Sequence, residues 1–113
     1  MYRNKYNNKK CRYKGYIYAS RREAADSMWL DSLLANGKLL EIQKQVKISV
    51  DVEGEHICNH YADFLVTLSD GRMKYIETKG LVTEVYRLKL KLIKALYPKM
   101  SYLINPTEQE VLA

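Results

Sequence analysis

The sequence predicts an α/β fold in which helices flank a small mixed sheet. Two observations lead to this prediction. Segments with helical and with strand periodicity follow one another in the order α-β-β-β-α-β, which is typical of a sheet packed against helices. The chain has 113 residues, enough for one hydrophobic core with about four strands and two helices. We therefore expect a single folded domain.

The first helix is predicted to begin after Ser20 and to end near Ala35. Ser20 followed by Glu23 is a capping-box pattern, in which each side chain satisfies a backbone N–H of the other residue. Asn36 and Gly37 then supply residues on which helices commonly end. The apolar stripe expected to face the core consists of Ala25, Met28, Trp29 and Leu33.

Three strands are predicted after this helix, over residues 39–50, 61–68 and 72–79. Ile48 and Val50 alternate with polar residues in the first of them, the pattern of a half-buried strand. Residues 51–55 are expected to form a turn. The second and third strands flank Ser69-Asp70-Gly71, which is typical of the turn in a β-hairpin.

A second helix is predicted from Glu84 to about Tyr97, where Pro98 ends it. A short strand over residues 101–104 and a small polar tail complete the chain. Four apolar residues at helical spacing are expected to form the buried face of this helix: Val85, Leu88, Leu92 and Leu96.

Positive charge is concentrated at the N-terminus. The formal net charge is +6, and the first 22 residues include no acidic residue. The basic residues there are Arg3, Lys5, Lys9, Lys10, Arg12, Lys14, Arg21 and Arg22. Tyrosines are interleaved with them, and this combination suits contact with a phosphate backbone and exposed bases. We interpret residues 1–19 as a basic, tyrosine-rich arm and residues 20–113 as the folded core; a solvated tail is the alternative for the arm. Within the arm, Tyr16-Ile17-Tyr18 is a candidate for a short strand.

Cys11 and Cys58 are far apart in sequence and belong to no CxxC motif, so we expect free thiols in a reducing, cytoplasmic compartment. No apolar run is long enough for a transmembrane helix. The charged N-terminus also lacks the apolar block of a secretory signal. We therefore expect a cytoplasmic protein that has no membrane partner.

Three charged residues lie on the hairpin formed by the second and third strands. Asp63 is on the second strand, and Glu77 and Lys79 are on the third, where residues two apart point to the same face. Pairing of the strands can bring Asp63 beside Glu77. Two carboxylates and an ammonium on one face suit a hard divalent cation and an activated water, the chemistry of phosphodiester cleavage. The alternative is a set of exposed charges that keeps an edge strand soluble.

These residues resemble the PD-(D/E)XK nuclease superfamily, over roughly residues 3–97. Within it, the chain is most similar to small phage-encoded nucleases and to phage endonuclease I type Holliday-junction resolvases. The residues that carry the resemblance are Asn4-Lys5-Tyr6, Lys9-Lys10, Ser20-Arg21-Arg22-Glu23-Ala24, Gln45, Tyr61-Ala62-Asp63-Phe64 and Glu77-Thr78-Lys79-Gly80. Ala62 departs from the proline in the superfamily name. The resemblance implies a restriction-endonuclease-like core and a phage or bacterial protein.

The resemblance also implies roles for the charged residues. Asp63 and Glu77 would bind Mg²⁺ or Mn²⁺ together with the carbonyl oxygen of Thr78, and Lys79 would orient the attacking water. Between two carboxylates Lys79 should stay protonated, so we do not expect it to act as a simple general base. Glu23 would complete the site from the first helix, with a second metal ion as one way of doing so. Its alternative role is to cap that helix.

Further polar residues are candidates for supporting or DNA-binding roles. Gln45 resembles a polar residue that some of these nucleases place near the site, with an exposed strand glutamine as the alternative. His60 is expected to contact a phosphate or a water. His56, Cys58 and His60 would share a strand face, but a closed zinc site needs a fourth ligand that the sequence does not supply there. The DNA-contact candidates are Lys5, Lys9, Lys10, Arg12, Lys14, Arg21, Arg22, Arg87, Lys91 and Lys94, the last three with a solvated helix face as the alternative.

We therefore expect a metal-dependent endodeoxyribonuclease, more specifically a resolvase that cuts branched DNA as a homodimer. Symmetric cuts in two strands call for two active sites related by a two-fold axis. Three alternatives remain: a nuclease that acts on linear duplex in nicking, restriction-like defence or transposition, a non-catalytic DNA-binding module on the same fold, and a protein-interaction domain.

Overall fold

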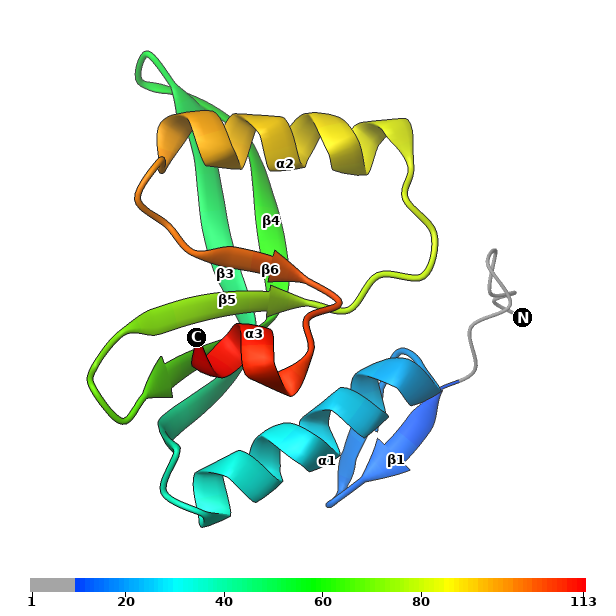
Figure 1. Ribbon diagram of the computed structural model, residues 1–113. Coiled ribbons are helices and arrows are strands. Elements are labelled where there is room, and N and C mark those ends of the chain that lie inside the picture. Colours follow the sequence, from blue (N-terminus) through cyan, green and yellow to red (C-terminus); the bar gives the residue numbers. More distant parts are fainter. Residues whose placement is uncertain (1–9) are drawn as a thin grey trace.

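A computed structural model describes residues 10–113 of the chain (Figure 1). Lys5 and Lys9, which were predicted to contact DNA, lie outside the described residues. The elements follow in the order β1 (Cys11–Tyr13), β2 (Tyr16–Tyr18), α1 (Arg21–Ala35), β3 (Leu39–Val52), β4 (Glu55–Leu68), β5 (Met73–Glu77), α2 (Glu84–Leu96), β6 (Tyr102–Ile104) and α3 (Glu108–Leu112).

The main sheet has four strands in the spatial order β3-β4-β5-β6. The β3–β4 and β4–β5 pairs are antiparallel, and β5 and β6 are parallel, so the sheet is mixed. The predicted α/β class with a small mixed sheet and flanking helices is therefore confirmed. Within residues 10–113, β1 and α3 are additions to the predicted set of elements, whereas β2 matches the short strand expected over Tyr16–Tyr18.

β3 and β4 form a long two-stranded ribbon that continues beyond β5, as Figure 1 shows. The turn between them contains Glu53 and Gly54, whose φ values are 53° and 80°. Two positive φ values in a two-residue turn are characteristic of a tight β-hairpin. The turn predicted over residues 51–55 is therefore present but tighter, and β4 begins at Glu55, so the predicted start of the second strand at residue 61 is wrong. His60 and Asp63 lie within a long paired strand instead of at its start.

α1 covers one end of the sheet and contributes to a first core cluster with Leu39, Phe64 and Val66. The predicted apolar stripe is wrong for Ala25 and Met28, which are exposed, and right for Leu33. The buried face of the helix includes the polar residues Glu23 and Ser27, so apolar periodicity alone does not identify it. Its buried residues are Glu23, Ala24, Ser27, Leu30 and Leu33.

Residues 11–18, which belong to the predicted arm, form the β1–β2 hairpin against α1. Tyr18 is fully buried in the first core cluster. Its hydroxyl lies 2.6 Å from the Ser27 hydroxyl, and this hydrogen bond satisfies both buried groups. The hairpin therefore belongs to the folded core, so the core starts before residue 20.

α2 lies across the far halves of β3 and β4 (Figure 1). Its buried residues are Tyr86 and Ile93, and Ile93 forms a second core cluster with Ile48, Val50 and Ala62. The predicted buried face is wrong, because Val85 and Leu88 are 63% and 60% exposed. Leu96 is also exposed and Leu92 is only partly buried. The sheet covers the neighbouring side of the helix.

In the described part of the chain no helix is long and apolar enough to cross a membrane. Cys11 and Cys58 are both free thiols, and they belong to different core clusters.

Candidate active site

An open pocket of about 710 Å³ lies where the N-termini of α1 and α2 meet the middle of β4 and the end of β5. Both helices begin on the same side of the sheet, as Figure 1 shows. The pocket brings together all four predicted catalytic residues from segments that are far apart in sequence. Its lining consists of residues 19–23, His60, Tyr61, Asp63, residues 77–81, Thr83, Val85, Tyr86 and Lys89.

Asp63 is held by one backbone and one side-chain donor. The Thr78 N–H donates to Asp63 Oδ2 over 2.7 Å, and the Gln45 amide donates to Asp63 Oδ1 over 3.2 Å. Burial raises the pKa of Asp63 to about 7, and the nearby charges of Glu23 and Glu77 act in the same direction. The two strand carboxylates predicted to cooperate are therefore electrostatically linked.

Glu23 lies in the first turn of α1 and is 5% exposed. Its Oε2 accepts a 3.2 Å hydrogen bond from the Ala19 N–H, and its Oε1 accepts one of 3.2 Å from the Gln45 amide. The Ser20 hydroxyl accepts from the Glu23 N–H at 3.1 Å, as predicted for the helix cap. Only this half of the predicted capping box forms, because the Glu23 carboxylate bonds Ala19. Burial raises the pKa of Glu23.

Gln45 links two of the acidic groups. It lies in β3 between the pairs Lys44–Phe64 and Val46–Ala62, and therefore opposite Asp63. Its φ of 51° is in the left-handed region, which costs a residue with a side chain roughly 1–2 kcal/mol. Such strain is typical of functional sites. The single Gln45 nitrogen donates to both Glu23 and Asp63, so Gln45 lies in the site and not only on an exposed strand.

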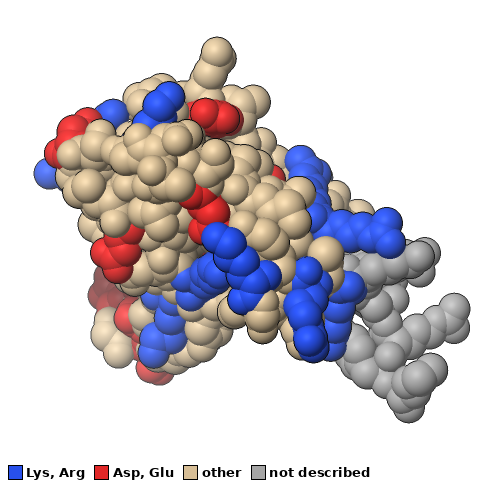
Figure 2. All heavy atoms as spheres, turned by 90° about the horizontal axis from the view of Figure 1, so that it is seen from below, with Lys and Arg blue, Asp and Glu red and all other residues tan. Residues whose placement is uncertain are grey.

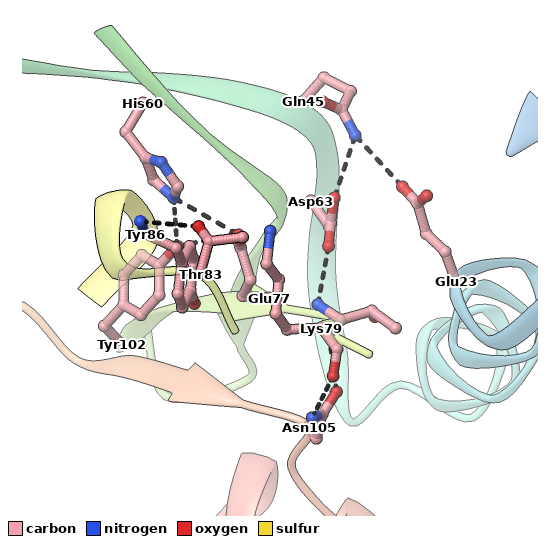
Figure 3. A network of polar contacts seen from close by, with 11 residues as sticks. Glu23, Gln45, His60, Asp63, Glu77, Lys79, Thr83, Tyr86, Tyr102 and Asn105 are labelled. Carbon is pink, nitrogen blue, oxygen red and sulfur yellow. Dashed lines mark hydrogen bonds and ion pairs between the residues drawn. The ribbon is translucent and has the colours of Figure 1, made fainter. Parts of the chain in front are cut away.

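Glu77 ends β5 and is 5% exposed. Figure 3 shows its carboxylate next to His60 and Tyr102. The Tyr102 hydroxyl donates to Glu77 Oε2 over 2.7 Å, and His60 Nε2 lies 3.4 Å from Glu77 Oε1 and 2.9 Å from the Tyr102 hydroxyl. Burial and the Glu77 charge raise the pKa of Tyr102, so Tyr102 remains a hydrogen-bond donor. His60 thus contacts Glu77 and not Asp63.

Lys79 and Tyr86 lie at the α2 side of the pocket. The Lys79 ammonium is 4.5 Å from the centre of the Tyr86 ring, a cation–π contact. Asn105 fixes the Lys79 backbone by accepting from its N–H and donating to its carbonyl, at 2.9 and 2.8 Å. The Tyr86 hydroxyl is buried without a hydrogen-bond partner among the described residues. Burial and the charges of Glu77 and Asp63 raise the pKa of Tyr86.

The carboxylate oxygens in the pocket are the ligand type that a hard divalent cation prefers. Their positions in the structure fit such a cation less well. Glu23, Asp63 and Glu77 gather negative charge in a largely buried place, and a divalent cation would offset it. Yet within residues 10–113 no group of three or more His, Cys, Asp or Glu residues is placed to hold a metal ion. Tyr102 already donates to one Glu77 oxygen, and His60 Nε2 lies 3.4 Å from the other.

Thr78, His56 and His60, which were considered for metal sites on the basis of the sequence, each contact another side chain of the protein. The Thr78 hydroxyl donates to Asp26 Oδ2 over 2.6 Å, which ties the segment after β5 to α1. His56 is exposed and bonds Asp51, at 2.6 Å, while His60 is buried beside Glu77. The described residues therefore do not bring the two histidines into a common zinc site.

The predicted DNA-contact residues fall into two groups. Arg21 and Arg22 line the pocket at the N-terminus of α1, together with Lys89, which the prediction omitted. The others among the described residues lie outside the pocket lining and are exposed: Lys10, Arg12, Lys14, Arg87, Lys91 and Lys94. Lys14 also pairs with Asp31 at 3.5 Å. Figure 2 shows many Lys and Arg side chains gathered on one side of the molecule.

Tyr86, Tyr102, Asn105 and Lys89 belong to the site although the prediction did not include them. The parallel pairing of β6 with β5 brings Tyr102 and Asn105 next to the pocket. Because this pairing joins segments that are far apart in sequence, no local sequence pattern predicts it. Lys89 and Tyr86 are three residues apart on α2, so their shared face was detectable in the sequence.

The fold and the pocket define a small α/β protein with a buried acidic site beside two helix N-termini. The chain belongs to the family described as a protein of unknown function, DUF1064, which matches residues 3–107. No curated protein and no solved structure matches the chain.

Proposed function

We propose that this protein is a metal-dependent endodeoxyribonuclease of the PD-(D/E)XK type, with a restriction-endonuclease-like core. The observation that carries the proposal is the convergence of Glu23, Asp63, Glu77 and Lys79 from three elements on one open pocket. The pKa of Asp63, raised to about 7, indicates that the pocket favours added positive charge. Such a pocket suits a metal ion with a phosphodiester.

The surroundings of the pocket also suit a phosphate. The N-termini of α1 and α2 contribute to its lining, and helix N-termini carry partial positive charge. Arg21, Arg22 and Lys89 add full positive charges at its edge. The basic residues on the exposed surface, with Lys5 and Lys9 of the N-terminus, would extend this contact along the DNA backbone.

Asp63 and Glu77 would hold Mg²⁺ or Mn²⁺, with the Thr78 carbonyl as a further oxygen ligand. The metal ion supplies a water with a lowered pKa and charge stabilisation at the phosphate. Lys79, released from its contact with Tyr86, would orient the attacking water. Gln45 would keep Glu23 and Asp63 at a fixed separation, and Glu23 would hold a second cation or a water.

We further propose branched DNA, such as a four-way junction, as the substrate and a homodimer as the active form. Two symmetric incisions require two pockets, which a two-fold dimer provides. A nuclease for linear duplex is the alternative within the same chemistry. Cleavage of matched junction, flap and linear duplex DNA with Mg²⁺, Mn²⁺ or EDTA tests these proposals. Preferential, EDTA-sensitive cleavage of the junction is expected, and equal cleavage of all three would contradict the branched substrate.

A non-catalytic DNA-binding module is the second candidate, because Tyr102 already donates to one oxygen of Glu77 and His60 lies 3.4 Å from the other. Calorimetric titration with Mn²⁺ separates the two functions. A nuclease should bind Mn²⁺ in the absence of DNA, and Asp63→Asn should abolish the binding heat. DNA binding without any metal binding would favour the module.

A further inference from the structure

α2 presents an apolar stripe that residues 10–113 leave largely uncovered. The members of this α2 stripe follow one another along one side of the helix and the loop before it: Leu81, Val82, Val85, Leu88, Leu92 and Leu96. Leu81 and Val82 are 53% and 42% exposed, and Val85 and Leu88 more so. The sheet takes up the side of the helix with Tyr86 and Ile93, and Leu92 packs partly against the same core cluster. The packing of the described residues therefore leaves most of the stripe exposed.

The α2 stripe is large for an exposed apolar patch. Five of its six side chains are 36–63% exposed, and Leu92, which packs partly against the second core cluster, adds less. Together they offer on the order of 500 Å² of apolar area, which is within the upper range for monomeric proteins. A two-fold contact doubles this area to roughly 1,000 Å², the lower limit for a specific interface. A second copy of the same stripe is therefore large enough and apolar enough to cover it.

Two opposite charges beside the stripe would pair between subunits that are related by a two-fold rotation. Glu84 and Lys91 are both exposed and lie one heptad apart, on the same flank of the stripe. If a second α2 runs antiparallel with the axis near Leu88, Glu84 of one subunit lies beside Lys91 of the partner subunit. The rotation generates the same pair twice, as an isologous interface requires.

We propose that the protein forms a two-fold dimer through antiparallel packing of the α2 stripes, with Leu88 at the centre and Glu84–Lys91 pairs at the flanks. Leu81 and Val85 also line the pocket, so the two pockets lie next to the interface. The inference depends on the exposed stripe and its charges and not on the chemistry of the pocket. The proposed function includes a homodimer but no interface, and the α2 stripe supplies that interface.

Light scattering after size exclusion tests the interface with the full chain and two matched variants. Leu88→Glu places a charge at the centre of the stripe, and Leu40→Glu makes the same change at a residue of β3 that is 62% exposed. The wild type and Leu40→Glu should have the mass of two chains, and Leu88→Glu that of one. Circular dichroism checks that all three are folded, which is expected because both leucines are exposed.

A charge exchange tests the antiparallel arrangement. Glu84→Lys and Lys91→Glu should each weaken dimerisation by roughly tenfold, and the double exchange should restore it. A wild type that remains monomeric at millimolar concentration overturns the proposal, as does a Leu88→Glu dimer as stable as the wild type. Failure of the double exchange to restore the dimer overturns the antiparallel arrangement.

Discussion

Gln45 and Asp63 lie opposite each other in neighbouring strands, and the Gln45 amide donates to Asp63 over 3.2 Å while Gln45 holds a left-handed backbone conformation. The same nitrogen donates to Glu23. The Gln45 amide thus links the carboxylates of Glu23 and Asp63, which would otherwise repel each other. The left-handed backbone conformation of Gln45 positions this amide between them. We regard this arrangement as the organising feature of the candidate site.

Gln45→Ala should raise the pKa of Asp63 above about 7, because the variant loses a hydrogen bond that stabilises the carboxylate. NMR titration of the Asp63 carboxyl carbon in the metal-free protein measures the pKa. Gln43→Ala, an exposed glutamine of the same strand, is the control. An unchanged Asp63 titration in Gln45→Ala would show that the amide contact does not form in solution.

The metal-free protein should lose stability as the pH rises from about 4 to about 7. The pKa of Asp63 is raised from 3.8 to about 7 in the folded state, so the native protein binds more protons than the unfolded chain between these values. The free energy of unfolding then falls with increasing pH, by on the order of 2–4 kcal/mol. Urea unfolding in EDTA at several pH values measures it.

Asp63→Asn should remove most of this pH dependence, because the variant has no proton to lose at that position. Addition of Mn²⁺ to the wild type should restore stability at pH values above 7, where the carboxylate is charged. Stability that increases between pH 4 and 7 would contradict the raised pKa of Asp63.

Tyr86→Phe and Tyr102→Phe should have opposite effects on stability. The Tyr86 hydroxyl is buried without a partner in the described structure, so its removal should be neutral or stabilise by up to about 1 kcal/mol. The Tyr102 hydroxyl donates to buried Glu77, so its removal should cost roughly 1–3 kcal/mol. Urea unfolding at one pH compares the two variants directly. Equal destabilisation by both would mean that Tyr86 has a partner in solution.

Glu23→Gln should separate the roles of Glu23 in the helix cap and in the pocket. The amide oxygen can still accept from the Ala19 N–H, so stability should change by less than about 1 kcal/mol. The lost charge should lower the pKa of Asp63 and reduce DNA cleavage by roughly 10–100-fold. Unfolding and cleavage assays on one preparation test both effects. Wild-type cleavage by the variant would assign Glu23 to the helix cap alone.

Local sequence patterns were sufficient for the fold class and for much of the pocket. The mixed sheet with flanking helices was readable, because alternation and turn residues act locally. The cap at Ser20 was readable for the same reason. These features place Glu23, Asp63, Glu77 and Lys79 on the lining of one pocket. Lys79 was expected on the same strand as Glu77, but β5 ends at Glu77 and Lys79 lies in the segment that follows it.

Other features depend on contacts that a local pattern does not contain. Tyr102 reaches Glu77 only because β6 adds to β5 in parallel. The left-handed backbone conformation of Gln45 could not be predicted, because glutamine is not a residue type that favours positive φ. The spacing of Leu88 and its neighbours correctly marks an apolar helix side, but spacing does not tell whether a sheet or another chain covers it.

Cleavage of a labelled four-way junction in Mg²⁺ tests the central claim most directly, with wild type, Asp63→Asn and the control Glu41→Gln compared at equal concentration. Glu41 is an exposed carboxylate of β3 outside the pocket lining, so its variant matches the charge change. We predict cleavage by the wild type and by Glu41→Gln, and a loss of roughly 100-fold or more for Asp63→Asn. No cleavage by the wild type in Mg²⁺ or Mn²⁺, or undiminished cleavage by Asp63→Asn, would contradict a nuclease centred on Asp63.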